Sequence, residues 1–326
     1  MDADSGKVED FPEAPYFDAR SFAAFKSMEL EAEDVVMVSY PKCGTSWVHF
    51  ILYGLLRMDA SGDFIVPPEG DIGAAGQVYA DGVRLRRADK PSRVELMPWS
   101  FEELLDQRRP RLFSCHIRAG NLPPSLLSRG RLILVARNPK DALVSWKFFV
   151  EKLSRTFPEM RDLAGRDWQQ AYDAFNTTEQ PDGYRYGDYY SHLRDMVGLV
   201  EQLGIRATIT FYEKLHEDFR SEVSRLAEFL QVPMSMAKLD AVEHFTRFET
   251  MKGEGTPGNH RKPVTLRKGE VGDHKHYLTA AHWSAMDCLF EERLGDLALL
   301  APLRRYVGTG AGRGESGGSR QPPERA

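Results

Sequence analysis

The residues of this chain best suited to chemistry stand in one short loop, Tyr40-Pro-Lys-Cys-Gly-Thr-Ser-Trp47. Lys42 supplies a positive charge, and Gly44 lets the backbone pass close to a ligand. Thr45 and Ser46 add hydroxyl groups at the start of a predicted helix, where unpaired N–H groups and the helix dipole favour anions. This combination predicts a cradle for a small anion. An ordinary capped turn between a strand and a helix is the alternative.

The order of lysine and glycine separates this loop from the nucleotide-binding P-loop, in which the lysine directly follows the last glycine. Here Lys42 precedes Gly44. No acidic residue is evidently placed to hold Mg²⁺, and no acidic cluster or His/Cys spacing indicates another metal. A phosphoryl-transfer enzyme of the P-loop class is therefore the less favoured interpretation, and we predict no metal site.

A short apolar run, a polar turn and a helical pattern follow one another three times along the chain. Unbroken apolar runs that alternate with helices indicate strands buried on both faces of a parallel sheet. We therefore predict an α/β fold, a single domain whose central parallel sheet is flanked by helices. The predicted strands are residues 34–39, 111–115, 131–136 and 207–211; the predicted helices are 47–56, 142–153 and 220–230, with residues 212–218 as a polar turn.

Several polar residues fall where the predicted strands end, and ligands of such sheets bind beyond the carboxyl ends of the strands. At that edge lie the loop 40–46, His116, Arg137 and Tyr212. A single histidine is more often structural than catalytic, but His116 shares its edge with Lys42 and Arg137. An imidazole, whose ordinary pKa is about 6.5, can accept a proton near neutral pH. His116 is therefore the candidate general base.

Composition narrows the class of protein. The 326 residues carry 43 Lys and Arg against 48 Asp and Glu, a net charge of -5, which argues against a dedicated nucleic-acid-binding protein. No stretch approaches the ~20 apolar residues of a membrane span, and no signal peptide is visible. The three cysteines form no disulfide framework, so we expect a cytoplasmic protein. We divide the chain into an acidic segment (1–20), one domain (21–307) and a disordered Gly/Ser/Arg-rich tail (308–326).

Four motifs, in order, resemble those of the cytosolic sulfotransferase family. The loop 40–47 resembles the family's 5′-phosphosulfate-binding segment, Tyr-Pro-Lys-Ser-Gly-Thr-Thr-Trp. Residues 134–145 resemble its 3′-phosphate-binding strand and helix, 211–215 its adenine segment, and 267–273 its late Arg-Lys-Gly clamp. The resemblance covers nearly the whole chain except its two ends. It implies a sulfotransferase-type, P-loop-like nucleotide-binding fold.

The resemblance also implies a donor, 3′-phosphoadenosine 5′-phosphosulfate (PAPS), and the residues that would hold it. The planar guanidinium of Arg137 suits a phosphate group. The 5′-phosphosulfate would be held by Lys42, Cys43, Gly44, Thr45 and Ser46; the 3′-phosphate by Arg137, Ser145, Arg267, Lys268 and Gly269; and the adenine by Trp47, Tyr212, Phe248 and Thr246.

The implied activity is PAPS-dependent sulfotransfer, in line, to a hydroxyl or amine of a small-molecule acceptor. The product of the donor would be 3′-phosphoadenosine 5′-phosphate (PAP). His116 would deprotonate the acceptor, and Lys42 would stabilise the negative charge building on the departing nucleotide. The expected partner is a small molecule, with no nucleic acid and no membrane. A membrane-anchored carbohydrate sulfotransferase is disfavoured because the sequence shows no membrane span.

Several positions depart from the family's pattern. Cys43 stands where serine is usual, and Ser114 stands where a lysine normally faces the sulfuryl group. Ile117 and Arg118 replace Leu-Pro, and His274 replaces a tryptophan. These changes indicate a divergent member with an altered acceptor site. They keep open the alternative of a catalytically impaired homologue that binds the nucleotide.

The sequence gives less information about the acceptor pocket and the oligomeric state than about the donor site. The pocket would be formed by residues 66–100, Phe149 and residues 245–262. Within it, the cationic stretch 84–93 is either a solvated surface loop or a feature that attracts an anionic acceptor. The segment 275–284 keeps two of the four positions of the family's dimer motif, so a monomer is slightly favoured over a weak homodimer.

Two cysteines fall at the same predicted edge, Cys43 in the anion loop and Cys115 beside the candidate base. Oxidation or alkylation there would block donor binding if the thiols were reactive. Two inert buried thiols are the favoured interpretation.

Overall fold

The computed structural model describes residues 19–68, 105–155, 158, 161–177, 186–253 and 267–308. The cationic stretch 84–93, most of the predicted acceptor loops within 66–100 and 245–262, and nearly all of both predicted terminal segments lie outside these residues. The structure therefore bears on the sheet, its helices and the residues at the carboxyl edge.

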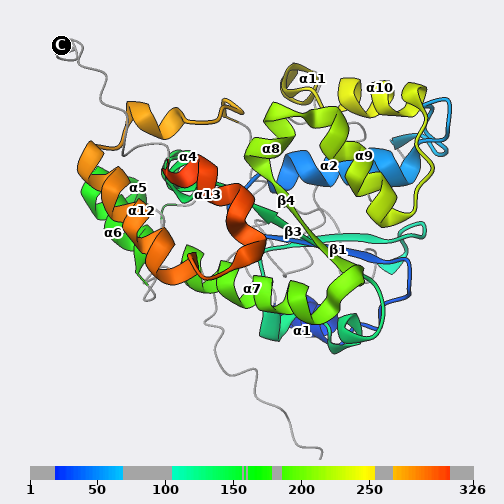
Figure 1. Cartoon of the computed structure of the whole chain (residues 1–326), viewed down its shortest axis with the longest axis horizontal. Helices are drawn as coiled ribbons and strands as arrows, with labels where there is room; N and C mark the ends of the chain where they lie inside the picture. The colour runs from blue at the N-terminus through cyan, green and yellow to red at the C-terminus, as the bar shows by residue number, and fades with distance from the viewer. Residues whose placement is uncertain are drawn as a thin grey trace, which may run out of the picture.

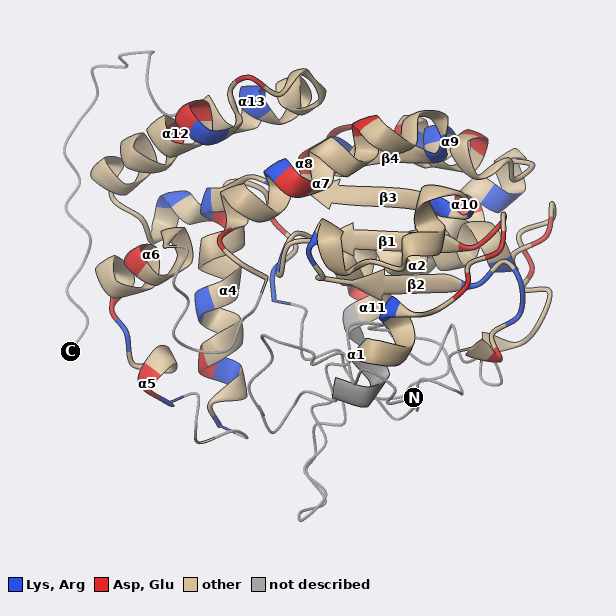
Figure 2. Ribbon diagram, turned by 90° about the horizontal axis from the view of Figure 1, so that it is seen from below, with Lys and Arg blue, Asp and Glu red and all other residues tan. Residues whose placement is uncertain are grey.

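In the described part of the chain, four strands form one sheet in the order β2-β1-β3-β4. Every neighbouring pair is parallel, and Figure 2 shows the arrowheads of β1 and β3 pointing the same way, toward α4. The predicted parallel sheet is confirmed, and the predicted strand ends differ from the observed ones by at most one residue. The strands are β1 (Val35–Ser39), β2 (Leu112–Cys115), β3 (Arg131–Ala136) and β4 (Ala207–Phe211).

Helices cover both faces of the sheet (Figure 1). One face packs against α2, α9 and α10, and the other against α7. The helices are α1 (Ala19–Lys26), α2 (Thr45–Arg57), α4 (Pro139–Leu153), α5 (Arg161–Ala164), α6 (Trp168–Asn176), α7 (Tyr189–Leu203), α8 (Tyr212–Glu217), α9 (Phe219–Leu230), α10 (Met236–Phe245), α11 (Phe248–Gly253), α12 (Ala280–Leu294) and α13 (Ala301–Val307).

The unbroken apolar sequence of β1 follows from this two-sided burial. Val36 and Val38 join the apolar cluster on the α7 side, whereas Val35 and Met37 join the one on the α2 side. All four side chains are fully buried. Each such burial stabilises the fold by roughly 1.5–3 kcal/mol relative to an exposed side chain. The centre of the sheet is therefore a rigid base for the loop that follows β1.

The prediction of a polar turn after β4 is wrong. Residues Tyr212–Glu217 form the helix α8, because Tyr212 and Leu215 lie one turn apart and are both buried. The helix ends at Asp218, whose carboxylate accepts the backbone N–H of Ser221 and begins α9 instead. Because most residues of this segment are polar, the sequence pattern did not reveal the short amphipathic helix.

The helix α4 begins earlier than predicted, at Pro139 rather than at residue 142. The side chain of Asn138 accepts the backbone N–H of Lys140 at 3.0 Å, and proline is tolerated in a first turn. The helix thus starts directly after Arg137. Among the described residues, no helix is both long and apolar enough to span a membrane.

Candidate functional site

The strand order brings two of the predicted binding segments together at the carboxyl end of β1. The chain leaves β1 toward β2 on one side and returns as β3 on the other, so the segments following β1 and β3 lie beside each other. Arg137, the first residue after β3, is buried there. Its Nη1 donates to the carbonyl of Lys42 at 3.0 Å and its Nη2 to the carbonyl of Glu270 at 3.1 Å. One guanidinium therefore joins three of the four sequence motifs.

The loop between β1 and α2 has the backbone that an anion cradle requires. Lys42 and Gly44 both have positive φ, 71° and 100°. A Cβ on Gly44 would lie 2.5 Å from Cδ2 of Tyr212, so this position tolerates no side chain without a shift. Within the described part of the chain, no side chain caps the first turn of α2. The start of the helix therefore remains suited to an anion.

The ammonium group of Lys42 lies against an aromatic ring and close to other positive charges. Its Nζ lies 4.0 Å from the centre of the Phe149 ring. Burial, together with the charges of Arg137, Lys152 and Arg267, lowers the pKa of Lys42 to about 7. Such crowding of positive charge is relieved when an anion binds among these groups.

The late clamp residues Arg267 and Lys268 are close to an internal carboxylate. Asp273 is 2.7 Å from Nζ of Lys268 and also pairs with Arg267. Although burial opposes it, these two hydrogen bonds lower the pKa of Asp273, so the carboxylate is charged. The Nε atoms of Arg267 and Arg137 are buried and have no partner among the described residues. These two Nε donors are therefore available to a ligand, although the carboxylate of Asp273 already pairs with the cations of the clamp.

A second carboxylate ties the clamp to α4. Asp141 accepts the backbone N–H groups of Gly272 and His274 at 2.7 and 3.0 Å, and lies 2.7 Å from Nδ1 of His274. Although burial opposes it, hydrogen bonding to His274 and the charge of Arg137 lower the pKa of Asp141 to about 2. His274, the residue that replaces the family's usual tryptophan, therefore acts as part of this anchor.

Two of the residues predicted to flank an adenine contact each other, and the other two contact different parts of the chain. The rings of Trp47 and Tyr212 meet edge to face, with centroids 5.4 Å apart. Phe248 lies against Gly269, where an added Cβ would come within 2.8 Å of Cδ2 of Phe248. The hydroxyl of Thr246 donates to the carbonyl of Val242 at 2.8 Å, so its donor is already used within the end of α10.

The remaining predicted phosphate ligand, Ser145, is half-buried on α4, two turns after Arg137. Its hydroxyl makes no hydrogen bond within the described residues, which leaves it available to a ligand.

His116 lies just beyond β2 and its imidazole is oriented by β1. Its Nδ1 is 2.7 Å from the carbonyl of Ser39, which can only accept, so Nδ1 carries the proton and Nε2 keeps the lone pair. Burial and the nearby charge of Lys42 lower the pKa of His116 to about 4, and the bond to Ser39 opposes this only in part. The imidazole is thus neutral at neutral pH, the form that a base requires.

Two departures from the family's pattern acquire local explanations. Ser114 is fully buried, and its hydroxyl lies 2.8 Å from Nδ1 of His49 on α2. A serine and a histidine thus satisfy each other at the position where the family has a lysine. Arg118 pairs with Asp195 of α7 at 2.6 Å, an exposed contact that contributes little to stability.

The cysteines behave as the favoured interpretation expects. Cys43 and Cys115 are both fully buried. Burial raises the pKa of Cys43 to about 12, so its thiol stays protonated and unreactive near neutral pH.

The segment that resembles a dimer motif runs from the 3₁₀ turn Asp273–His276 into α12. Thr279 caps that helix by accepting the backbone N–H of His282 at 3.3 Å. Its match to the motif therefore has an explanation within a single chain.

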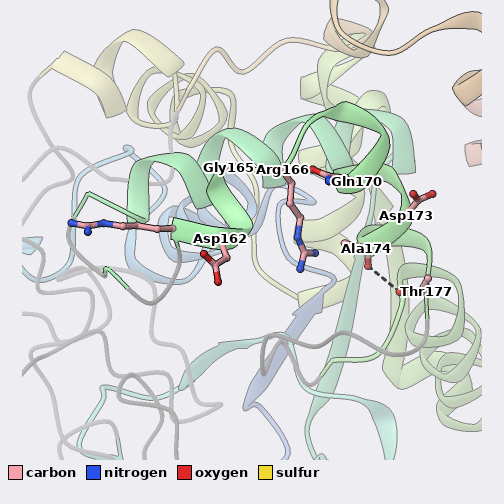
Figure 3. Close-up of a pocket in the computed structure, with 8 residues that line it drawn as sticks. Asp162, Gly165, Arg166, Gln170, Asp173, Ala174 and Thr177 are labelled. Atoms are coloured by element: carbon pink, nitrogen blue, oxygen red, sulfur yellow. Dashed lines mark hydrogen bonds between the residues drawn. The ribbon is translucent and has the colours of Figure 1, made fainter.

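A surface pocket of about 700 Å³ lies elsewhere, between α5 and α6 (Figure 3). Its walls carry charges of both signs, and none of the residues predicted for the site lines it. The lining residues are Arg161, Asp162, Gly165, Arg166, Gln170, Asp173, Ala174 and Thr177.

Sequence reasoning missed several residues that shape the site. Asp141 and Asp273 stood inside two of the quoted motifs, where a carboxylate close to cations predicted to bind phosphate was itself a signal. His216, one turn after Tyr212, lies 4.6 Å from the ring of Trp47 and 4.7 Å from that of Tyr212. Ser39, which orients His116, left no signal because it reads as the end of a strand.

Comparison with known proteins identifies relatives along most of the chain. A family described as "Sulfotransferase domain" matches residues 32–298. Sulfotransferase 6B1 of Danio rerio is 25% identical over 85% of this chain and 83% of its own length. The amine sulfotransferase of Oryctolagus cuniculus is 26% identical, covering 86% and 87% of the two chains.

Solved structures show the same fold. Mouse sulfotransferase SULT7A1 complexed with PAP superposes with a TM-score of 0.68 at 19% identity, over 92% of this chain and 98% of the other. Retinol dehydratase in complex with androsterone and PAP gives 0.58 at 18% identity, over 86% of each chain.

Proposed function

The chain belongs to the sulfotransferase domain family, and on that premise we propose that it transfers a sulfuryl group from PAPS to a hydroxyl or amine of a small molecule. The observation that carries this proposal is the double hydrogen bond of Arg137, which joins the anion loop to the late clamp. Cations from three segments converge there, and PAP is the nucleotide named in the solved structures of similar fold.

The residues present fit a nucleotide that carries two phosphate groups. Arg137 and Arg267 each keep a buried Nε without a partner in the described part of the chain, and Ser145 is half-buried on α4. Gly44 and Gly269 keep two aromatic rings close to the backbone, where any side chain would collide. Lys42, Arg137, Arg267 and Lys268 supply the positive charge. We propose that these residues hold the phosphates, and that Trp47, Tyr212 and Phe248 contact the base.

PAPS, when bound, supplies an activated sulfuryl group and a phosphate leaving group. Lys42 then stabilises the negative charge that builds on the departing phosphate, and its pKa rises as that anion approaches. His116 accepts the proton of the acceptor at Nε2, while Ser39 holds Nδ1. The ring of Phe149 beside Lys42 excludes water from this ammonium group. Positioning and charge stabilisation account for most of the rate enhancement.

The acceptor class rests on the relatives rather than on the described residues. The relatives include an amine sulfotransferase and a 3-alpha-hydroxysteroid sulfotransferase. We propose a small acceptor with one nucleophilic hydroxyl or amine, and both classes belong in the test.

An acceptor screen with radiolabelled PAPS tests this proposal. The full chain is incubated with phenols, steroids, other alcohols and amines, beside His116→Ala and a matched surface variant, His244→Ala on α10. We expect labelled product from at least one acceptor class with the wild type and with His244→Ala, and roughly 100- to 10,000-fold less with His116→Ala. Equal product from His116→Ala would overturn the assignment of the base.

The second candidate function, nucleotide binding without sulfotransfer, is favoured by one observation: Ser114 and His49 replace a lysine at the reacting side. It predicts tight binding of PAP and no labelled product from any acceptor. Product formation by the wild type would reject it.

A further inference from the structure

A second histidine touches the main chain of the candidate base. His192 lies on α7, fully buried, with Nε2 at 3.0 Å from the carbonyl oxygen of His116. His116 follows the last residue of β2, and among the described strands only β1 pairs with β2. The carbonyl of His116 lies beyond the strand pairing, and its partner comes from α7 instead.

The chemistry of this contact fixes which nitrogen donates. Burial lowers the pKa of His192 to about 4, so its ring is neutral and carries one N–H. Because a carbonyl can only accept, that proton is on Nε2. Nδ1 is then a buried lone pair, and it has no partner among the described residues. Burying an unpaired polar atom costs free energy, so packing alone would favour an apolar side chain here.

The same imidazole packs against the anion loop. Its ring meets that of Tyr40 edge to face, with centroids 5.5 Å apart. Tyr40 opens the loop that carries Lys42, and its hydroxyl donates to the carbonyl of Gly187, next to the start of α7. His192 therefore contacts the two segments that carry the candidate base and the candidate leaving-group cation.

We propose that His192 is a positioning residue, which holds the main chain of His116 at a fixed place relative to the anion loop. This inference rests on the proposed function, because it assigns a role toward the same reaction. Two bonds then fix the base: β1 orients its ring through Ser39, and α7 holds its backbone through His192. A displacement of about 1 Å at a reacting group lowers rates by roughly 100-fold.

The test compares three variants of the full chain. His192→Leu removes the donor, whereas His192→Gln keeps an N–H at similar reach. His282→Leu is the matched control, because His282 is a buried histidine of α12 whose Nε2 is also hydrogen-bonded, 2.9 Å from Oε1 of Gln169. We expect His192→Leu to lower kcat by about 10–100-fold, with the Kd for PAP unchanged within about twofold. His192→Gln recovers most of kcat, and His282→Leu stays near wild type.

A spectroscopic readout separates this proposal from the proposed function, because it requires no turnover. With ¹⁵N-labelled histidine, His116 should give the Nδ1–H pattern and His192 the Nε2–H pattern. In His192→Leu the pKa of His116 should rise from its low value toward the ordinary one, whereas in His192→Gln it stays low.

An unshifted His116 signal in His192→Leu would overturn the positioning role even if the wild type sulfates acceptors. Equal losses of kcat and of PAP affinity in both His192 variants would also overturn it, since they would indicate a general packing defect. If the pKa of His116 shifts in His192→Leu but the wild type gives no product from any acceptor, the positioning role is upheld and sulfotransfer is rejected.

Discussion

The two halves of the candidate site use opposite electrostatics. The nucleotide half gathers Lys42, Arg137, Arg267 and Lys268, with Asp273 as resident counterion. The base half is neutral: burial keeps the pKa of His116 at about 4. Binding an anion requires positive charge, whereas a general base requires an unprotonated nitrogen with an available lone pair. One edge of the sheet carries both the cations and the base. Lys42 and Arg137 follow the central strands β1 and β3, and the other two cations belong to the late clamp, whereas the base follows β2, at the end of the described strand order.

The largest effect should come from the neutral half. His116→Ala removes the proton acceptor but no charge, so we expect turnover to fall by roughly 100- to 10,000-fold. The Kd for PAP, measured by calorimetry, should change by less than about twofold, since neutral His116 contributes no net charge to phosphate binding. A large loss of PAP affinity in this variant would break the division into two halves.

The next effect should come from the charged half. Arg267→Ala removes a guanidinium with an unused buried donor, so the Kd for PAP should rise by about 10–100-fold, the range for a hydrogen bond to a charged group. At saturating donor, kcat should change far less. The conservative variant Arg267→Lys keeps the charge and should fall between the two. A variant that lowers kcat and leaves PAP affinity intact would place Arg267 in the wrong half.

The pH dependence of nucleotide binding should sharpen the comparison. Lys42 binds anions only when protonated, and its pKa is about 7 in the unliganded protein. Affinity for PAP should therefore be complete below this pH and fall by up to about tenfold per pH unit above it, until the raised pKa of the complex is reached. Lys42→Met should remove this slope, and His116→Ala should keep it. A flat profile in the wild type would show that Lys42 does not sense the nucleotide.

The smallest effect concerns the resident counterion. Asp273→Asn removes the charge that pairs with Arg267 and Lys268, while retaining the shape of the side chain. If the carboxylate competes with phosphate, the Kd for PAP should fall by about threefold, and its dependence on salt should steepen. Weaker binding would instead indicate that Asp273 organises the clamp for the nucleotide.

The elements that the sequence predicts best are those whose residues all obey one periodicity. The run Val35–Val38 is apolar throughout, and it is a strand buried on both faces. The segment after β4 fails because its polar residues outnumber Tyr212 and Leu215, although those two suffice to bury one face of α8. Local composition cannot show that a neighbouring helix covers so short an apolar face.

The site divides in the same way. Lys42, Gly44 and Arg137 were predictable, because they follow strands within motifs of definite spacing. The contact between His192 and His116 joins residues 76 positions apart, and that between Asp141 and His274 joins residues 133 positions apart. No periodicity links such positions, since only the packing of α7 and of the clamp loop brings them together.

The strand order also has a mechanical consequence. β1 and β3 are each paired on both sides, so the backbone leading to the candidate anion loop resists displacement from either direction. Among the described strands, β2 is paired on one side only. Its residue Ser114 contacts His49 of α2, and His116, which follows it, contacts His192 of α7. Substitution of His49 or His192 is therefore expected to affect the end of β2 more than the candidate anion loop. The central strands thus form a rigid side of the candidate site, and β2 forms a more deformable side. The replacements at positions 114, 117 and 118 all lie in β2 or just after it.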